Sequence, residues 1–269
     1  MRRELRSSMT VAVTAPTAFV LANSPAQGVP LESERLTVSL AEPGGGSREL
    51  AVRELDEDPL TRLQLFEAAP GIVTIDYETV VLGRAAAVGV HPIEAILYLR
   101  PSRYVQSDTL TPFARETFSS RDAARLVREV SSWVHAHLEY TAEATTPTGG
   151  AVETLAARAG VCRDYAHLTA ALLRALDVPA RLVSVYAPQL DPMDFHAVVE
   201  ALVDGRWVVV DSTRLAPRAG MVRMATGRDA TDTAWLTNTL SDVQLLTLFV
   251  DATSDDVFTD DPDELVALS

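Results

Sequence analysis

The sequence predicts an α+β protein in which a small antiparallel β domain precedes a core built from helices and a second antiparallel sheet. Over roughly the first hundred residues, strand-like segments alternate with turns and show no helical period. Amphipathic helices follow, and three further strand segments come after them. A run of strands followed by helices and then by strands is typical of the α+β class. We expect a β-sandwich-like domain at residues 1–97, a domain of helices and strands at 98–250 and an acidic tail at 251–269.

The β domain is predicted from six apolar or alternating segments. They are Val11–Val13, Ala18–Leu21, Arg35–Leu40, Arg48–Leu55, Arg62–Ala68 and Gly71–Leu82. The first 26 residues loosely resemble a signal peptide, but Thr14, Pro16 and Thr17 interrupt the apolar run, so we interpret this region as two strands around a turn. The sequence has no apolar run long enough to span a membrane.

Three helices are predicted next, over residues 122–140, 152–159 and 162–178. Asp122 can cap the first, and a stripe of apolar residues at helical spacing follows it. The third opens at Cys162 and presents one apolar face, and Pro179 ends it because the residue before a proline is disfavoured in a helix. Strands are then predicted at 180–187, 195–203 and 206–211, and the acidic tail is expected to be solvated or loosely docked.

Charge and cysteine content limit the partners. The chain has 37 acidic and 23 basic residues, for a net charge of −14. Such a field repels nucleic acid and anionic lipid, so we expect neither as a partner. The single cysteine cannot form an internal disulfide, and we therefore expect a cytoplasmic protein. No histidine, cysteine and carboxylate cluster has metal-ligand spacing, so neither a metal nor a cofactor is expected.

The position of Cys162 at the start of a predicted helix favours a role as a nucleophile. A helix start carries unpaired N–H groups and a partial positive charge, which favour a thiolate, the nucleophilic form of cysteine. The alternative is that Cys162 is a small buried apolar residue. A thiol nucleophile needs a histidine base, which in turn needs an orienting carboxylate.

A predicted hairpin supplies such a pair. Asp204-Gly205 is a favoured two-residue turn and places Val203 opposite Arg206. In that register His196 and Asp211 are diagonal neighbours on one side of the sheet, roughly 7–8 Å apart between Cα atoms. The alternative is a chance pairing on an edge hairpin.

The cysteine and hairpin segments together resemble the bacterial transglutaminase-like family. The resemblance rests on GVCRDYAHLTAALLRALDVPARLVSVY and DPMDFHAVVEALVDGRWVVVDSTRLAPR, and on residues 99–108, 154–162 and 221–234. It implies that residues 98–250 form a transglutaminase-like catalytic domain with a papain-like core, behind the N-terminal β domain. It also implies that Cys162 is the nucleophile, His196 the base and Asp211 the orienting acid.

Three positions depart from the family pattern. The tryptophan after His-Ala is Val198, the proline that often follows the aspartate is Ser212, and a cysteine found in many relatives is Val105. We expect Val198 to change the wall beside His196. Arg163 and Asp164 are expected to fix the helix start, while Arg228, Asp229 and Asp232 either line the cleft or pair with one another.

The resemblance implies cysteine-dependent acyl transfer or hydrolysis at an amide bond through a thioester. The substrate would be a peptide, a protein or a small amide, and the acceptor either water or an amine. The backbone N–H of Cys162 would supply part of an oxyanion hole, with Tyr104 as the expected second donor. The alternative function is a catalytically silent binding module on the same fold.

Overall fold

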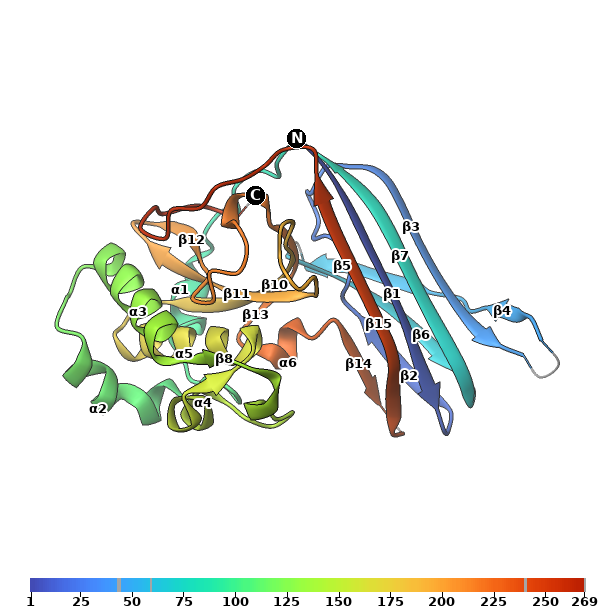
Figure 1. Cartoon of the computed structure of the whole chain (residues 1–269), viewed down its shortest axis with the longest axis horizontal. Helices are drawn as coiled ribbons and strands as arrows, with labels where there is room; N and C mark the ends of the chain where they lie inside the picture. Colours follow the sequence, from blue (N-terminus) through green and yellow to red (C-terminus); the bar gives the residue numbers. More distant parts are fainter. Residues whose placement is uncertain (43–44, 59, 240, 269) are drawn as a thin grey trace.

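A computed structural model describes residues 1–42, 45–58, 60–239 and 241–268. It contains a two-sheet β sandwich and, beside it, a helix-rich core around a separate sheet (Figure 1). Both termini lie at the same end of the molecule, near the top of Figure 1.

Two antiparallel sheets form the sandwich. The larger sheet consists of β1 (Arg2–Val13), β3 (Leu31–Ala41), β4 (Ser47–Glu49), β7 (Gly71–Leu82) and β15 (Val243–Ser254). These strands are arranged in the order β15-β1-β7-β3-β4. The smaller sheet consists of β2 (Thr17–Leu21), β5 (Arg53–Asp58), β6 (Thr61–Ala68) and β14 (Leu236–Thr239), in the order β14-β2-β6-β5.

The alternation of side chains along these strands builds the sandwich core. Leu5, Met9 and Val11 of β1 are fully buried, as expected where every second residue faces inward. Phe19 of β2 and Phe66 of β6 stack with ring centroids 4.8 Å apart. The segment that loosely resembles a signal peptide thus forms β1 and β2.

The helix-rich core is built on a four-stranded antiparallel sheet. Its strands are β10 (Ala180–Tyr186), β11 (His196–Val203), β12 (Arg206–Val210) and β13 (Val222–Gly227), in the order β12-β11-β10-β13. The helices are α1 (Pro92–Leu97), α2 (Ser107–Thr117), α3 (Ala123–His137), α4 (Ala151–Ala157), α5 (Cys162–Ala175) and α6 (Ala230–Thr233). Two short parallel strands, β8 (Glu139–Tyr140) and β9 (Ala159–Gly160), precede α5.

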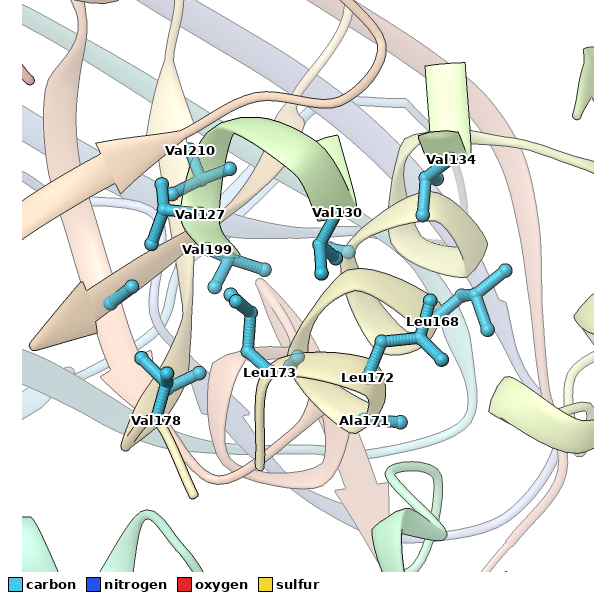
Figure 2. Close-up of a cluster of buried hydrophobic side chains, with 14 of the residues drawn as sticks. Val127, Val130, Val134, Leu168, Ala171, Leu172, Leu173, Val178, Val199 and Val210 are labelled. Carbon is cyan, nitrogen blue, oxygen red and sulfur yellow. The ribbon is translucent and has the colours of Figure 1, made fainter. Parts of the chain in front are cut away.

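Helix α5 packs between α3 and one face of this sheet. Its fully buried Leu168, Leu172 and Leu173 meet Val130 of α3 and Val199 of β11 (Figure 2). The helix carrying the cysteine therefore packs on an antiparallel sheet behind an N-terminal β-rich region, and the predicted α+β class is confirmed.

Several predicted elements differ in their bounds. Helix α3 ends at His137, and Glu139 and Tyr140 form β8 instead of its last turn. Residues 48–55 are not one strand, because the chain crosses there from β4 in one sheet to β5 in the other. The short helices α1 and α2 have no counterpart among the predicted elements.

The acidic tail is solvated over residues 255–264, as expected, but it is anchored to the core and not loosely docked. The Arg218 guanidinium pairs with Asp260 at 3.0 Å and donates to the carbonyl oxygens of Asp261 and Glu264. Leu268 is 3% exposed and packs against the face of the core sheet opposite α5. The division of the chain into domains stays a prediction, but β15 runs through its boundary at residue 250.

None of the helices among the described residues is long and apolar enough to cross a membrane.

Candidate active site

Cys162 is the first residue of α5, and its surroundings fix the helix start. The Val161 N–H donates to Oδ2 of Asp164 at 3.0 Å, which satisfies one of the free N–H groups at this terminus. The Arg163 guanidinium donates to Thr145 Oγ1 and to the Thr146 carbonyl oxygen, both at 2.7 Å. Arg163 and Asp164 thus hold the helix start in place, as expected.

His196 reaches the site through the predicted hairpin. Strands β11 and β12 pair in the predicted register, from Val203 opposite Arg206 to Val199 opposite Val210. Asp204 and Gly205 form the turn with φ values of 49° and 75°, which is why the two-residue loop needs an aspartate and a glycine. His196 therefore begins β11, and Asp211 follows the last residue of β12.

His196 and Asp211 are joined by a buried hydrogen bond. Nε2 of His196 lies 2.9 Å from Oδ2 of Asp211, and both side chains are 1% exposed. The other carboxylate oxygen of Asp211 accepts from the N–H and the hydroxyl of Thr213, at 2.9 and 2.7 Å. The carboxylate is thus held on two sides and fixes the orientation of the imidazole.

The pKa of His196 is raised and that of Asp211 is lowered, and both shifts favour the charged forms of the two side chains. Burial lowers the pKa of His196, but the Asp211 carboxylate, together with the neighbouring Cys162, more than offsets this effect and raises that pKa to about 10. Burial raises the pKa of Asp211, yet the neighbouring imidazolium and the Thr213 hydrogen bonds bring it below its ordinary value. With Nε2 bound to Asp211, Nδ1 is the ring nitrogen available to the thiol. The structure thus brings the three predicted residues to one place, because Cys162 and His196 line the same pocket and His196 is bonded to Asp211.

Cys162 and His196 line a pocket of about 500 Å³. One wall is a continuous stretch around α6 and the start of β14, including Ala230, Trp235 and Thr237. Phe195 stacks on Trp235, with ring centroids 5.4 Å apart, and makes this wall largely apolar. Two other hollows, of about 400 and 530 Å³, contain neither a cysteine nor a histidine.

The remaining predicted residues have structural partners. Arg228 and Asp232 pair at 2.8 Å, and Asp229 accepts from the Tyr104 N–H at 3.1 Å. Tyr104 lines the pocket, and its hydroxyl donates to the Pro147 carbonyl oxygen at 3.2 Å.

The expected effect of Val198 on the wall beside His196 is wrong. Val198 is 1% exposed and packs with Val183 and Val185 on the face of the sheet opposite α5. Successive side chains of a strand point to opposite faces, so Val198 lies on the face opposite Val199, which packs under α5. Val198 is not among the residues that line the pocket.

Two further residues support the site, and neither was predicted. Burial and the neighbouring Cys162 raise the pKa of Tyr140. Tyr140 was missed because its segment was expected to continue a helix. His167 accepts a hydrogen bond from the Ala230 N–H at 3.2 Å and stacks on Tyr104, so it packs behind two residues that line the pocket. Burial lowers the pKa of His167 to about 4, so it is neutral.

No group of three or more histidine, cysteine, aspartate or glutamate side chains capable of holding a metal ion occurs within the described ranges.

Comparison with known proteins gives a family and a full-length structural relative. The sequence profile of the transglutaminase-like superfamily matches residues 112–212, a range that contains Cys162, His196 and Asp211. A crystal structure from Cytophaga hutchinsonii, described as a "putative cysteine protease", is 30% identical, with a TM-score of 0.85. The alignment covers 98% of this chain and 96% of that chain.

Two curated mycobacterial proteins match over shorter regions. Protein ML0607 of Mycobacterium leprae is 26% identical over 145 residues, which cover 51% of this chain and 52% of that protein. Protein Rv2569c of Mycobacterium tuberculosis is 35% identical over 81 residues, covering 30% of this chain and 26% of that protein. The chain therefore spans about half, or less, of the length of these curated relatives.

Proposed function

The chain belongs to the transglutaminase-like superfamily, and from this premise we propose that it is a cysteine-dependent enzyme that cleaves or exchanges amide bonds. The observation that carries the proposal is the position of His196, hydrogen-bonded to Asp211 on one side and facing Cys162 on the other, at a pocket open to substrate. This is the arrangement that thiol nucleophiles need.

In the proposed reaction the Cys162 sulfur attacks the carbonyl carbon of the amide. A C–S bond forms, the thiol proton resides on His196, and the carbonyl oxygen takes up negative charge. The C–N bond then breaks as His196 donates that proton to the leaving nitrogen, which gives a thioester and a free amine. Asp211 holds the imidazole in the orientation that both transfers require.

The thioester is resolved by a second nucleophile. If water attacks, His196 takes its proton and the enzyme is a protease or amidase. If an amine attacks, the enzyme is a transglutaminase or amide synthase. None of the 269 residues is a lysine, so an added amine would compete with no lysine side chain of the chain itself.

The oxyanion formed in the first step needs hydrogen-bond donors. The backbone N–H of Cys162 is the proposed first donor, because it lies at the attacking residue and at a helix start. Tyr104 stays the predicted second donor and would have to exchange its bond to the Pro147 carbonyl for one to the substrate.

The proposal is tested with the single cysteine as its handle. Cys162→Ala should abolish release of amine from a peptide p-nitroanilide, and it should leave the circular dichroism spectrum and melting temperature unchanged. Cys162 is the one cysteine that iodoacetamide can label, so one equivalent bound should inactivate the wild type as completely as the Cys162→Ala substitution does. Chelators should have no effect.

The outcomes separate the candidate functions. Turnover by Cys162→Ala would end the catalytic assignment. Slow alkylation at the rate of a free thiol, together with no turnover, would identify a silent binding module. Partition of the thioester between water and added hydroxylamine would distinguish hydrolysis from transfer.

We further propose a peptide, protein or small amide as substrate, with neither nucleic acid nor membrane as partner, because the net charge is −14. A cytoplasmic location stays a prediction.

A further inference from the structure

Strand β14 forms one edge of the smaller sandwich sheet, and its first residues line the pocket that contains Cys162. The strand pairs with β2 through Leu236 opposite Leu21 and Thr239 opposite Ala18. It is terminal in the sheet order, so its other side has no strand partner within that sheet. Leu236 and Thr237 belong to the pocket lining together with Cys162 and His196. A free strand edge of the β sandwich thus borders the proposed active site.

The hydrogen-bonding direction of this edge follows from one backbone contact. The Ala22 N–H donates to the Trp235 carbonyl oxygen at 3.0 Å, so the polar groups of Trp235 point toward β2. In an antiparallel pair, neighbouring residues direct their N–H and C=O groups to opposite sides. The N–H and C=O of Leu236 and Asn238 are therefore directed away from β2, toward the open side of the strand.

The lining of the pocket favours an uncharged, apolar occupant. Among the described residues that line it, Arg163 is the one Lys, Arg, Asp or Glu, and its guanidinium is already bonded to Thr145 and Thr146. Phe195 and Trp235 form a stacked aromatic wall beside Cys162. In a chain with a net charge of −14, this apolar surface contrasts with the rest of the molecule.

We propose that the substrate is an extended peptide that adds to the open edge of β14 as a further antiparallel or parallel strand and places an amide carbonyl at Cys162. Main-chain bonds to Leu236 and Asn238 would hold the peptide backbone, and an apolar side chain would lie against Phe195 and Trp235. The inference rests on the proposed function for the chemistry, and it narrows the substrate from any amide to an extended polypeptide segment.

A backbone scan of the substrate tests this without changing the protein. The probe is acetyl-Leu-Ala-Leu-Ala p-nitroanilide, compared with versions carrying one N-methyl group at each position in turn. Because alternate residues of a strand direct their N–H groups to the same side, N-methylation should lower kcat/KM about tenfold at every second position and little between them. A loss with no period of two, or no loss at all, would overturn the proposal.

A matched pair of variants tests the enzyme side. Leu236→Pro and Leu236→Ala both truncate the side chain, but the proline also removes the outward N–H without removing a bond to β2. The ratio of kcat/KM for the peptide to that for p-nitrophenyl acetate should be about tenfold lower in Leu236→Pro than in Leu236→Ala. Equal ratios in two folded variants would contradict the proposal.

Binding separates this inference from the proposed function. Cys162→Ala, titrated with the fluorescein-labelled tetrapeptide, should show the same period-two dependence on N-methylation in Kd. If the wild type turns over no substrate but this pattern in Kd persists, the chemistry fails and the peptide site stands. If turnover occurs without the pattern in either measurement, the chemistry stands and the strand-addition site is refuted.

Discussion

Replacing Asp211 by asparagine should move the alkaline limit of activity by several pH units. Asparagine keeps the size of the side chain but removes the negative charge that lies 2.9 Å from His196 Nε2. The wild-type pKa of His196 is raised to about 10 by that carboxylate together with Cys162, against the lowering effect of burial. Without the carboxylate, burial dominates, and the pKa of His196 should fall to its ordinary value of about 6.5 or below.

The size of the effect follows from the imidazolium fraction. At pH 8 a group with a pKa of about 10 is about 99% protonated, whereas one with a pKa of about 6.5 is about 3% protonated. The proposed proton donation to the leaving amine needs the imidazolium, so Asp211→Asn should lose about thirtyfold in kcat/KM at pH 8 from protonation alone. The loss should shrink toward pH 5.5, apart from any fixed cost of misorienting the ring.

The assay is kcat/KM for the peptide p-nitroanilide from pH 5 to 10.5. The control is Asp122→Asn, an exposed carboxylate at the start of α3 where asparagine caps equally well. The Asp122→Asn variant should lose activity at the same alkaline pH as the wild type. An alkaline limb at the same pH in Asp211→Asn and in the wild type would refute the reasoning.

The raised pKa of His196 also predicts that the stability of the fold depends on pH. A raised pKa of His196 stabilises the fold fully below about pH 6.5 and loses this contribution as the pH rises through about 10. The free energy of unfolding of the wild type should therefore fall across that window. It should fall less in Asp211→Asn, as measured by urea denaturation at each pH.

Three further predictions concern the triad and its supports. The double variant His196→Ala/Asp211→Ala should have the kinetics of His196→Ala alone, because the carboxylate then has no imidazole to orient, and fully multiplicative losses would show that the two act separately. Asp122→Ala removes the bond of 2.7 Å from the Arg125 N–H and should cost about 1 kcal/mol in urea denaturation, with kcat unchanged. Gly160→Ala would place a Cβ 2.6 Å from the Cβ of Asp164, so it should lower the free energy of unfolding by about 1–3 kcal/mol and also lower kcat. An unaltered kcat would show that this helix start tolerates displacement.

The parts of the fold predicted from the sequence are those fixed by local rules. Helix α5 follows from a single apolar face that ends before Pro179, and the β11–β12 hairpin follows from its two-residue turn. Because a turn sets the register along a whole hairpin, the contact between His196 and Asp211 can be predicted even though the two residues are fifteen positions apart.

The missed parts depend on contacts that no local pattern encodes. Helix α1 is six residues long and buries none of them, and α2 contains Pro112, so neither shows the expected helical signal. The short strand β14 depends on β2, more than two hundred residues earlier in the chain, and this pairing brings Leu236 to the pocket wall. The wall opposite Cys162 therefore could not be predicted even though the reactive residues could.

The pairing of β15 with β1 has a consequence for how the protein is made. Arg3 lies opposite Ser254, so β1 pairs with a strand that is synthesised much later. The two strands can pair only after the whole helix-containing core between them has been translated, and until then one side of β1 lacks this partner. Pairings this distant in sequence form slowly and leave strand edges open to aggregation. Nascent chains that stop before residue 243 should thus be retained by chaperones, whereas chains that include all of β15 should be released.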